Sequence, residues 1–298
     1  MPIEFAHNGG VKLAYERMGP REGEPLLLIV GTALQMVAWA DGLCAELGAR
    51  GFAVVRYDNR DSGLSTRVEA EGASRRRPAY TLDDLADDAV AVMDALGWDS
   101  AHLFGAAAGG VIAQLTALRR PHRVRTLGLA ASYAGWRLGR MRPGAILRMI
   151  GKGLRRPAPG REGYARAFVE AVRPLTTPEH PLDEEMWREI ALTMFDRCPE
   201  PGPGSMRQAA ALQAAGDLLP RLGGVTVPTL VIHGEADPVV RVRSAREIAA
   251  AVPGARLVLY PGMGHDLPRG LWPSIADELR ALASGAATAQ GPPSGSTA

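Results

Sequence analysis

The chain has 298 residues, of which 46% are hydrophobic, and this is enough for one large α/β domain with an inserted subdomain. Its 34 basic and 32 acidic residues leave a formal net charge of +2, a balance that argues against a nucleic-acid-binding protein. The two cysteines, Cys44 and Cys198, lie far apart and in no metal-ligand spacing, and no apolar stretch reaches the roughly 20 residues needed to cross a bilayer. We therefore expect a protein of a reducing cytoplasm, with no signal peptide at residues 1–16, no disulfide, no membrane partner and no metal or organic cofactor.

Along most of the chain, short apolar runs alternate with longer amphipathic stretches. The short runs, bounded by Gly, Pro or Asp, predict buried strands at 25–30, 52–57, 100–104, 124–131, 229–233 and 256–260. The longer stretches predict helices at 37–49, 81–96, 243–251 and 272–283, and one that follows the strand at 100–104 and ends near residue 118. Thr81 is an expected N-cap, and Asp83 and Asp84 suit the dipole of the helix it starts. These repeated units imply an α/β fold with a mainly parallel sheet covered by helices on both faces.

Between Tyr133 and Pro220 this alternation stops, and helical, Arg-rich segments punctuated by proline replace it. An all-helical insertion between two strands is most simply a cap over the carboxyl edge of the sheet, with a separate domain as the alternative. The prediction is a core at 1–132 and 221–283 and a helical cap at 133–220. The arginines between Arg137 and Arg173 read as a solvated helical face. Residues 284–298 are rich in Gly, Pro, Ser and Ala and are expected to be disordered.

A small-residue turn, Gly105-Ala106-Ala107-Ala108-Gly109-Gly110, follows the third predicted strand. A nucleophile elbow has the form G-x-S-x-G between a strand and a helix, and its glycines are needed because the turn is strained and its neighbours are close. The spacing and context match, but Ala107 stands where the serine belongs. Taken alone the turn is weak evidence, since tight packing of a helix on a sheet explains it as well.

Two later loops supply the partners that such an elbow requires. In this kind of site the nucleophile, the acid and the histidine follow in that order along the chain. Asp237, followed by Pro238, comes directly after the strand at 229–233, and His265 lies in a glycine loop after the strand at 256–260. Asp237 could instead be a helix N-cap or a turn former, and a lone histidine in a loop is often only a polar residue on the surface. Their order and register favour an acid that orients a catalytic histidine.

The oxyanion hole needs two backbone N–H groups that point at the developing negative charge. Ala108, which follows the nucleophile position, supplies one, and Thr32, after the first buried strand and Gly31, is the better candidate for the other. A further motif, Arg56 to Thr66, follows the second strand, and its Asp, Arg and Ser side chains can lock the loops near the elbow by charge-assisted hydrogen bonds. We interpret that motif as structural support.

Together these residues resemble the α/β-hydrolase superfamily over most of the chain outside the insertion and the tail. The closer resemblance is to the methylesterases of anthracycline biosynthesis, of the aclacinomycin and rhodomycin D type. It is carried by Leu-Leu-Leu-Ile-Val-Gly-Thr at 26–32, Trp39, the motif at 56–66 with Arg-Asp where most relatives have Arg-Gly, and the loop Gly-Met-Gly-His-Asp-Leu-Pro at 262–268. Related hydrolases share several of these motifs.

The resemblance implies a small-molecule substrate, a methyl ester on a glycosylated tetracyclic aromatic polyketide. The products would be methanol and the free acid, which can then lose CO2. The family's serine, acid and histidine fall on Ala107, Asp237 and His265, and its oxyanion donors fall on Thr32 and Ala108. Methionine and aromatic side chains would line the pocket for a flat polycycle, although such residues are more often core: Met36, Trp136, Met194 and Phe195.

Ala107 leaves three interpretations open. In the first, it replaces the serine of an esterase, by variation or by design, and the chain is inactive or nearly so. In the second, alanine is natural and His265 with Asp237 acts as a base on water or on the substrate, giving a hydrolase, lyase or cyclase without a covalent step. In the third, the chain is a non-catalytic binding or accessory protein in contact with another biosynthetic enzyme.

Overall fold

The computed structural model describes residues 2–69, 77–137, 139–142, 144, 159–199 and 203–290, and the statements below concern those residues. Its centre is an eight-stranded sheet with the order β1-β2-β4-β3-β5-β6-β7-β8. The strands are β1 (Glu4–Asn8), β2 (Val11–Met18), β3 (Glu24–Ile29), β4 (Phe52–Tyr57), β5 (Ala101–Ala106), β6 (Val124–Ala130), β7 (Thr229–Gly234) and β8 (Arg256–Tyr260). The pairs from β4 to β8 are parallel, and only the pairs of β2 with β1 and with β4 are antiparallel.

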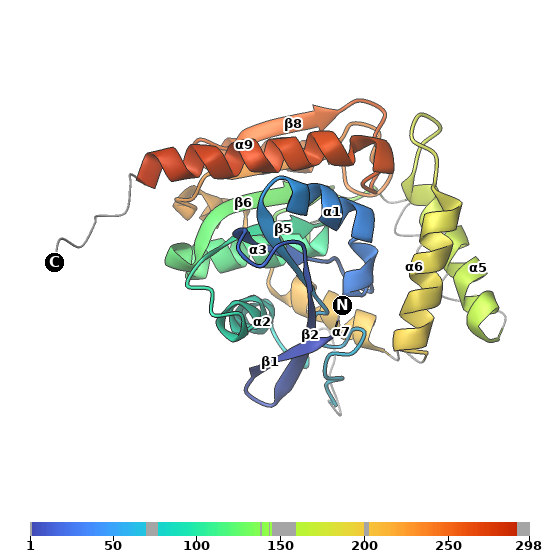
Figure 1. Cartoon of the computed structure of the whole chain (residues 1–298). Coiled ribbons are helices and arrows are strands. Elements are labelled where there is room, and N and C mark those ends of the chain that lie inside the picture. The colour runs from blue at the N-terminus through green and yellow to red at the C-terminus, as the bar shows by residue number, and fades with distance from the viewer. Residues whose placement is uncertain are drawn as a thin grey trace.

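Helices cover both faces of the sheet (Figure 1). The α-helices are α1 (Asp41–Ala49), α2 (Leu82–Ala95), α3 (Ala108–Arg119), α5 (Arg161–Val172), α6 (Glu184–Arg197), α7 (Gly204–Ala214), α8 (Val242–Ala251) and α9 (Trp272–Gln290). Short 3-10 turns lie at Met36–Ala38, Pro121–Arg123, Arg173–Leu175, Leu219–Gly224 and Arg269–Leu271. In the described part of the chain, no helix combines the length and apolarity that crossing a membrane requires.

The continuous apolar sequence of β3 shows why this sheet must be covered twice. Leu26 and Leu28 pack on one face in the same cluster as residues of α1 and α9, whereas Leu27 and Ile29 pack on the other face with α2, α3 and α8. Successive strand residues point to opposite faces, so an apolar residue at every position requires helices on both. The predicted α/β architecture, a mainly parallel sheet with helices on both faces and a helical insertion, is confirmed.

The sequence analysis missed the N-terminal hairpin of β1 and β2. β2 carries Lys12, Glu16 and Arg17 among its apolar residues, so it has no uninterrupted apolar run. Glu16 is nevertheless buried, because its carboxylate pairs with the guanidinium of Arg56 on the neighbouring β4 at 2.7 Å. That pairing joins residues far apart in the sequence, and no pattern within one strand predicts it.

The helix predicted at 37–49 is wrong as a single element. The structure has a 3-10 turn at Met36–Ala38 and then starts α1 at Asp41. The carbonyl of Trp39, between the two, accepts a hydrogen bond from the buried side chain of Arg56. Ala40, the residue before α1, has φ −52° and ψ 141°, so the helical ladder is interrupted there and begins again at Asp41. By contrast, Thr81 caps α2 as predicted, in a reciprocal pair with Asp84.

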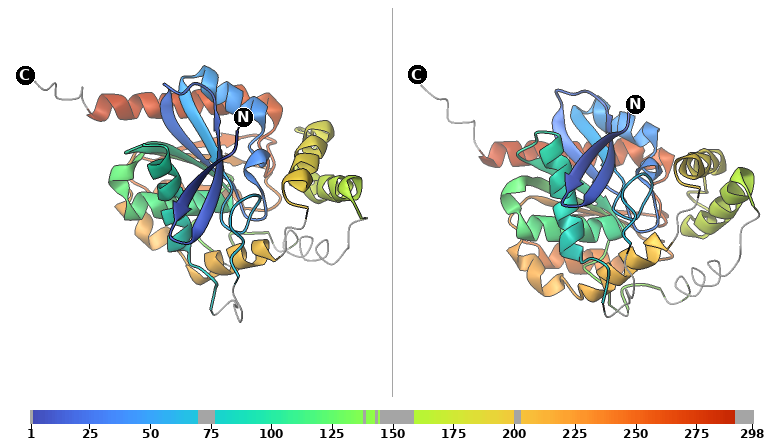
Figure 2. Two further views of the ribbon diagram at one scale, coloured as in Figure 1. Left: turned by 60° about the horizontal axis from the view of Figure 1, so that its bottom comes forward. Right: turned by 90° about the horizontal axis from the view of Figure 1, so that it is seen from below.

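The inserted helices α5, α6 and α7 follow β6 and precede β7. Figure 2 shows α5 and α6 side by side, away from the helices that cover the sheet, with α7 closer to the core. The boundaries predicted for core and cap remain a prediction. The disordered tail predicted from Ser284 needs a correction, since α9 continues to Gln290; the rest of that tail lies outside the described residues.

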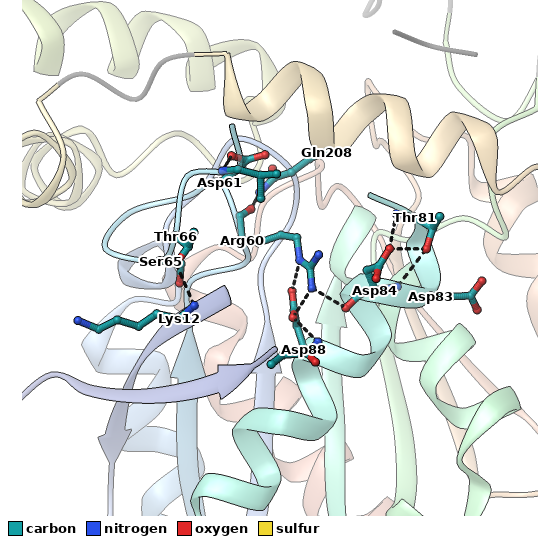
Figure 3. A network of polar contacts seen from close by, with 12 residues as sticks. Lys12, Arg60, Asp61, Ser65, Thr66, Thr81, Asp83, Asp84, Asp88 and Gln208 are labelled. Atoms are coloured by element: carbon teal, nitrogen blue, oxygen red, sulfur yellow. Dashed lines mark hydrogen bonds and ion pairs between the residues drawn. The ribbon is translucent and has the colours of Figure 1, made fainter. Parts of the chain in front are cut away.

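The motif after β4 organises a polar network at the end of the sheet (Figure 3). Arg60 donates two hydrogen bonds of 2.6 Å to Asp88 of α2, and both side chains are almost fully buried. The Arg60 carbonyl accepts a hydrogen bond from Gln208 of α7, and Asp61 pairs with Arg207 of the same helix. This motif therefore ties α2 and the insertion to the sheet, in the supporting role that the sequence indicated.

Replacing Arg60 tests that role. Arg60→Met leaves the Asp88 carboxylate buried without its cation, so we expect the free energy of unfolding to fall by about 3–5 kcal/mol in urea titrations. Arg161→Met is the matched control, because Arg161 makes the same two-pronged contact with Asp196 on an exposed surface and its loss should change stability little. An equal loss of unfolding free energy in the two variants would contradict the supporting role of Arg60.

Candidate active site

Ala107 occupies the turn between β5 and α3 in a backbone conformation that side chains rarely adopt. Its φ is 49° and its ψ is −117°. The turn is held from both sides, because the Ala107 amide donates to the Ala130 carbonyl at 2.9 Å and the Ala107 carbonyl accepts from the Ser132 hydroxyl at 2.8 Å. A strained turn held in this way presents the side chain of residue 107 at the carboxyl edge of the sheet.

The glycines around this turn are required by close contacts. A Cβ on Gly105 would lie 2.5 Å from the Gly109 carbonyl oxygen, and a Cβ on Gly109 would lie 2.0 Å from that of Ile29. The first turn of α3 therefore packs directly on the end of β3. The sequence allowed two explanations of these small residues, tight packing of a helix on the sheet and a nucleophile elbow. The structure has both in the same turn.

The predicted oxyanion residues lie together beside the elbow. A Cβ on Gly31 would lie 3.5 Å from the Ala107 Cβ and 3.9 Å from the Ala108 amide nitrogen, so the loop after β3 touches the elbow. Thr32 and Ala108 line the same small cavity, with Asn59 on its wall. Thr32 and Ala108 therefore lie close together beside residue 107, and their role as oxyanion donors remains a prediction.

Asp237 and His265 are hydrogen-bonded to each other. His265 Nδ1 lies 2.8 Å from Asp237 Oδ2, and the other carboxylate oxygen accepts the amides of Val239 at 2.7 Å and Val240 at 2.8 Å. Asp237 is fully buried, whereas the His265 side chain keeps 14% of its surface exposed. β5, β7 and β8 are parallel, so residue 107, the acid and the histidine all follow strand ends at one edge of the sheet.

The pair is polarised toward an ionised acid and a basic histidine. Burial alone would raise the pKa of Asp237, but the positive charge of His265 and its hydrogen bond outweigh it and leave this pKa below its usual value. Burial would lower the pKa of His265, but the Asp237 carboxylate outweighs it and raises the pKa above its ordinary value. His265 with Nδ1 bonded to an anion is oriented to accept a proton at Nε2.

Residues 25–269 match the family described as serine aminopeptidase, S33. The chain belongs to this family of α/β hydrolases. The sequence is 32% identical to rhodomycin D methylesterase DnrP of Streptomyces peucetius, over 93% of this chain and 96% of that one. It is 30% identical to the putative carbamate hydrolase RutD of Variovorax paradoxus, over 85% and 89% of the two chains.

Among solved structures, the esterase RhEst1 from Rhodococcus sp. superposes on this α/β hydrolase with a TM-score of 0.75, over 96% of this chain and 100% of that one, at 21% identity. That likeness shows the fold. Several of the relatives are named as methyl ester esterases, and the resemblance to rhodomycin D methylesterases that the sequence motifs indicated is confirmed.

The insertion of this α/β hydrolase holds the loops that carry the acid and the histidine. The His265 amide donates to the Leu175 carbonyl at 2.7 Å, and the Thr177 hydroxyl donates to the Gly262 carbonyl at 2.6 Å. On the acid side, Arg142 Nε donates to the Asp237 carbonyl at 2.9 Å. Segments near the start and in the middle of the inserted region therefore contact the loops of the acid–histidine pair.

The oxyanion loop is tied to the insertion in the same way. The Gln35 side chain donates to the Met194 carbonyl of α6 at 2.9 Å, and the Ala33 amide donates to the Gln208 side chain of α7 at 3.1 Å. Arg197 of α6 contacts both Gln35 and the buried Asp58. The sequence analysis missed Gln35, Arg197 and Gln208, since a single polar residue in an amphipathic helix carries no local sign of a distant partner.

The four predicted substrate-binding residues do not form one group. Met36 and Met194 are both buried in the apolar cluster on the α1 and α9 face of the sheet. Phe195 faces α5, with its ring centroid 5.6 Å from that of Tyr164. Trp136 is half-buried beside the bridge that joins Gly135 to Asp217, at the start of the insertion. Their role in binding substrate remains a prediction.

Metal chemistry has no evident site in the part of the chain that the structure describes. There, no three His, Cys, Asp or Glu side chains converge in a way that could hold an ion.

Ala107→Gly tests the strain at the elbow. Glycine adopts a positive φ at no steric cost, so we expect the variant to gain about 1 kcal/mol in the free energy of unfolding, measured by denaturant titration. The neighbour Ala108→Gly is the control, because Ala108 starts α3 and glycine in a helix costs about 0.5–1 kcal/mol. A loss of stability in Ala107→Gly would show that the turn is not strained.

Proposed function

We propose that this α/β hydrolase is a methylesterase of the anthracycline type whose covalent route is absent because Ala107 occupies the nucleophile position. The observation that carries the proposal is the elbow itself: Ala107 keeps a strained positive-φ backbone beside two candidate oxyanion residues, while an acid–histidine pair follows β7 and β8 at the same edge of the sheet. The alanine side chain has no lone pair to attack a carbonyl carbon. The chain as given would then bind its ester and cleave it slowly or not at all.

With serine at position 107, the proposed reaction has two stages, acylation and hydrolysis. His265 Nε2 accepts the hydroxyl proton as the serine oxygen bonds to the ester carbonyl carbon, and the amides of Thr32 and Ala108 bind the resulting oxyanion. His265 returns the proton to the methoxy oxygen, and methanol leaves. Water, deprotonated by His265, then cleaves the acyl-enzyme and regenerates the serine.

The proposed substrate class is supported by the apolar lining on the inserted helices. Tyr164, Phe168 and Trp187 form a ladder of rings, 6.1 Å and 6.0 Å apart in succession, with the first pair stacked. All three are half-buried and pack against the cluster that contains Met36 and Met194. Aromatic faces of this kind suit a flat polycycle, and the relative at 32% identity is named for rhodomycin D.

A second candidate is catalysis by His265 on water without a covalent step. The intact hydrogen bond between His265 and Asp237, at the same sheet edge as an alanine that has no proton to give, favours this candidate. His265 would deprotonate a water, the hydroxide would attack the ester carbonyl, and the proton would go to the methoxide as methanol leaves. The backbone donors and binding alone leave enhancements of about 10³–10⁴ over water in hydrolases that lack their nucleophile.

Ala107→Ser distinguishes these candidates. We expect the serine form to hydrolyse methyl esters of anthracycline-type acids at least about 10²-fold faster than the alanine form, since only it can form an acyl-enzyme. Release of free acid is followed by chromatography, and a covalent acyl adduct is sought by intact mass in the serine form.

His265→Ala in both backgrounds is the matched control. It should abolish the gain in the serine form. If it also abolishes turnover by the alanine form, and the serine form is no faster, the second candidate replaces the first. Ligand binding without turnover by any form, measured by fluorescence of the polycycle, would contradict both and leave a binding protein.

The pH dependence of the serine form tests the role of His265 as the base. The base must be unprotonated, and the Asp237 carboxylate raises the pKa of His265 above its ordinary value of 6.5 despite the opposing effect of burial. We therefore expect kcat/KM to rise with pH through a midpoint above 6.5. Asp237→Asn should move this midpoint down and lower the plateau, because the anion that raises the pKa is gone. A value of kcat/KM that does not change with pH on either side of 6.5 would contradict the role of His265 as the base.

A further inference from the structure

A second histidine contacts the acid, and the activity proposed above does not use it. His233, near the end of β7, is fully buried. Its Nε2 lies 3.1 Å from the Val240 carbonyl oxygen and 3.4 Å from Asp237 Oδ2. Both neighbours are acceptors, so Nε2 must carry a proton.

The other ring nitrogen shows that this histidine stays neutral. His233 Nδ1 is buried and has no hydrogen-bond partner in the described part of the chain, so a proton there would be unsatisfied. Burial lowers the pKa of His233, and the nearby positive charge of His265 lowers it further, although Asp237 acts in the opposite direction. His233 is therefore a fixed N–H donor with one orientation.

The contact with Val240 closes a ring of hydrogen bonds around the acid. The Val240 amide donates to Asp237 Oδ1, and the carbonyl of the same residue accepts from His233. The Val239 amide holds Oδ1 as well. With Oδ1 fixed by the turn and the turn fixed by His233, Oδ2 is left facing His265 Nδ1 at 2.8 Å.

We propose that His233 is a positioning residue for the pair formed by Asp237 and His265. It anchors the acid turn through Val240 and presents its N–H dipole to Oδ2, so the carboxylate stays aligned with His265. The inference concerns the same site as the proposed function, but it can be tested on the pair itself, without turnover.

Other charged and titratable groups also face this pair. Asp266 follows His265, and burial raises its pKa to about 6; His180, from the insertion, is a nearby positive influence on it. Arg142 donates to the Asp237 carbonyl. These groups remain in place when His233 is replaced, so a change in His265 can be assigned to His233.

The experiment is an NMR titration of the His265 ring in the 15N-labelled full chain with Ala107, with resonances assigned through His265→Gln. The test variants are His233→Phe, which fills the space without a donor, and His233→Gln, which restores an N–H. The matched control is His102→Phe: His102 is also a buried strand histidine, with Thr126 and Glu24 as partners, but it lies away from the acid turn. Circular dichroism and thermal unfolding report whether each variant is folded.

We expect the His265 pKa to fall in His233→Phe by about 0.5–1 unit toward its ordinary value, because a loosened carboxylate stabilises the imidazolium less. The low-field Nδ1 proton of the bond to Asp237 should broaden or disappear in this variant. His233→Gln should restore both signals, and His102→Phe should leave both unchanged. A folded His233→Phe with an unchanged or higher His265 pKa and the same Nδ1 proton would overturn the proposal.

The Ala107→Ser background separates this result from the proposed function. If the serine form turns over ester, His233→Phe should shift the acid limb of kcat/KM down by the same amount as the NMR titration. If the serine form is inactive, the esterase proposal fails, while the NMR arm still decides the role of His233. If His233→Phe does not fold, His233→Gln is compared with His233→Asn, because the longer and the shorter side chain place their N–H groups at different positions. The same two signals, the His265 pKa and the low-field Nδ1 proton, then decide the role of His233.

Discussion

The close approach of α3 to β3 is the constraint on which the rest of the site depends. Because Gly109 lies against the Ile29 carbonyl, the chain can pass from β5 into α3 only through a strained turn, and Ala107 takes its positive φ there. The same contact brings the loop after β3, with Gly31 and Thr32, against the elbow. One packing contact between two backbones thus fixes both the position of residue 107 and that of Thr32, the candidate oxyanion donor.

The inserted helices act as a scaffold for the site as well as a cover. Leu175 and Arg142 hold the histidine and acid loops through hydrogen bonds, and Arg197 links the oxyanion loop to the buried Asp58. Buried ion pairs contribute little net stability, since desolvation of both charges offsets their attraction, but breaking one by removing a partner is costly. Such pairs therefore specify where the insertion sits more than they stabilise the fold.

Backbone and neighbour contacts explain how an alanine can occupy the elbow without disturbing it. The turn is held by the amide and carbonyl of residue 107, and the acid is held by the amides of Val239 and Val240. None of these contacts uses a side-chain oxygen at residue 107. The strain of a positive φ, typically about 1–3 kcal/mol for a non-glycine residue, is thus maintained by surroundings that need no side-chain oxygen at this position.

The sequence by itself determined the parallel strands, the elbow glycines, and the order of Ala107, Asp237 and His265, because each rests on local periodicity or on short spacing along the chain. Only the tertiary structure decided which polar residues serve the site. The hairpin of β1 and β2, the interruption before α1, and the contacts of Arg197 and His233 all depend on partners brought together by folding. A buried charge or imidazole is stable only beside its partner, and that partner lies elsewhere in the sequence, so no local pattern can reveal it.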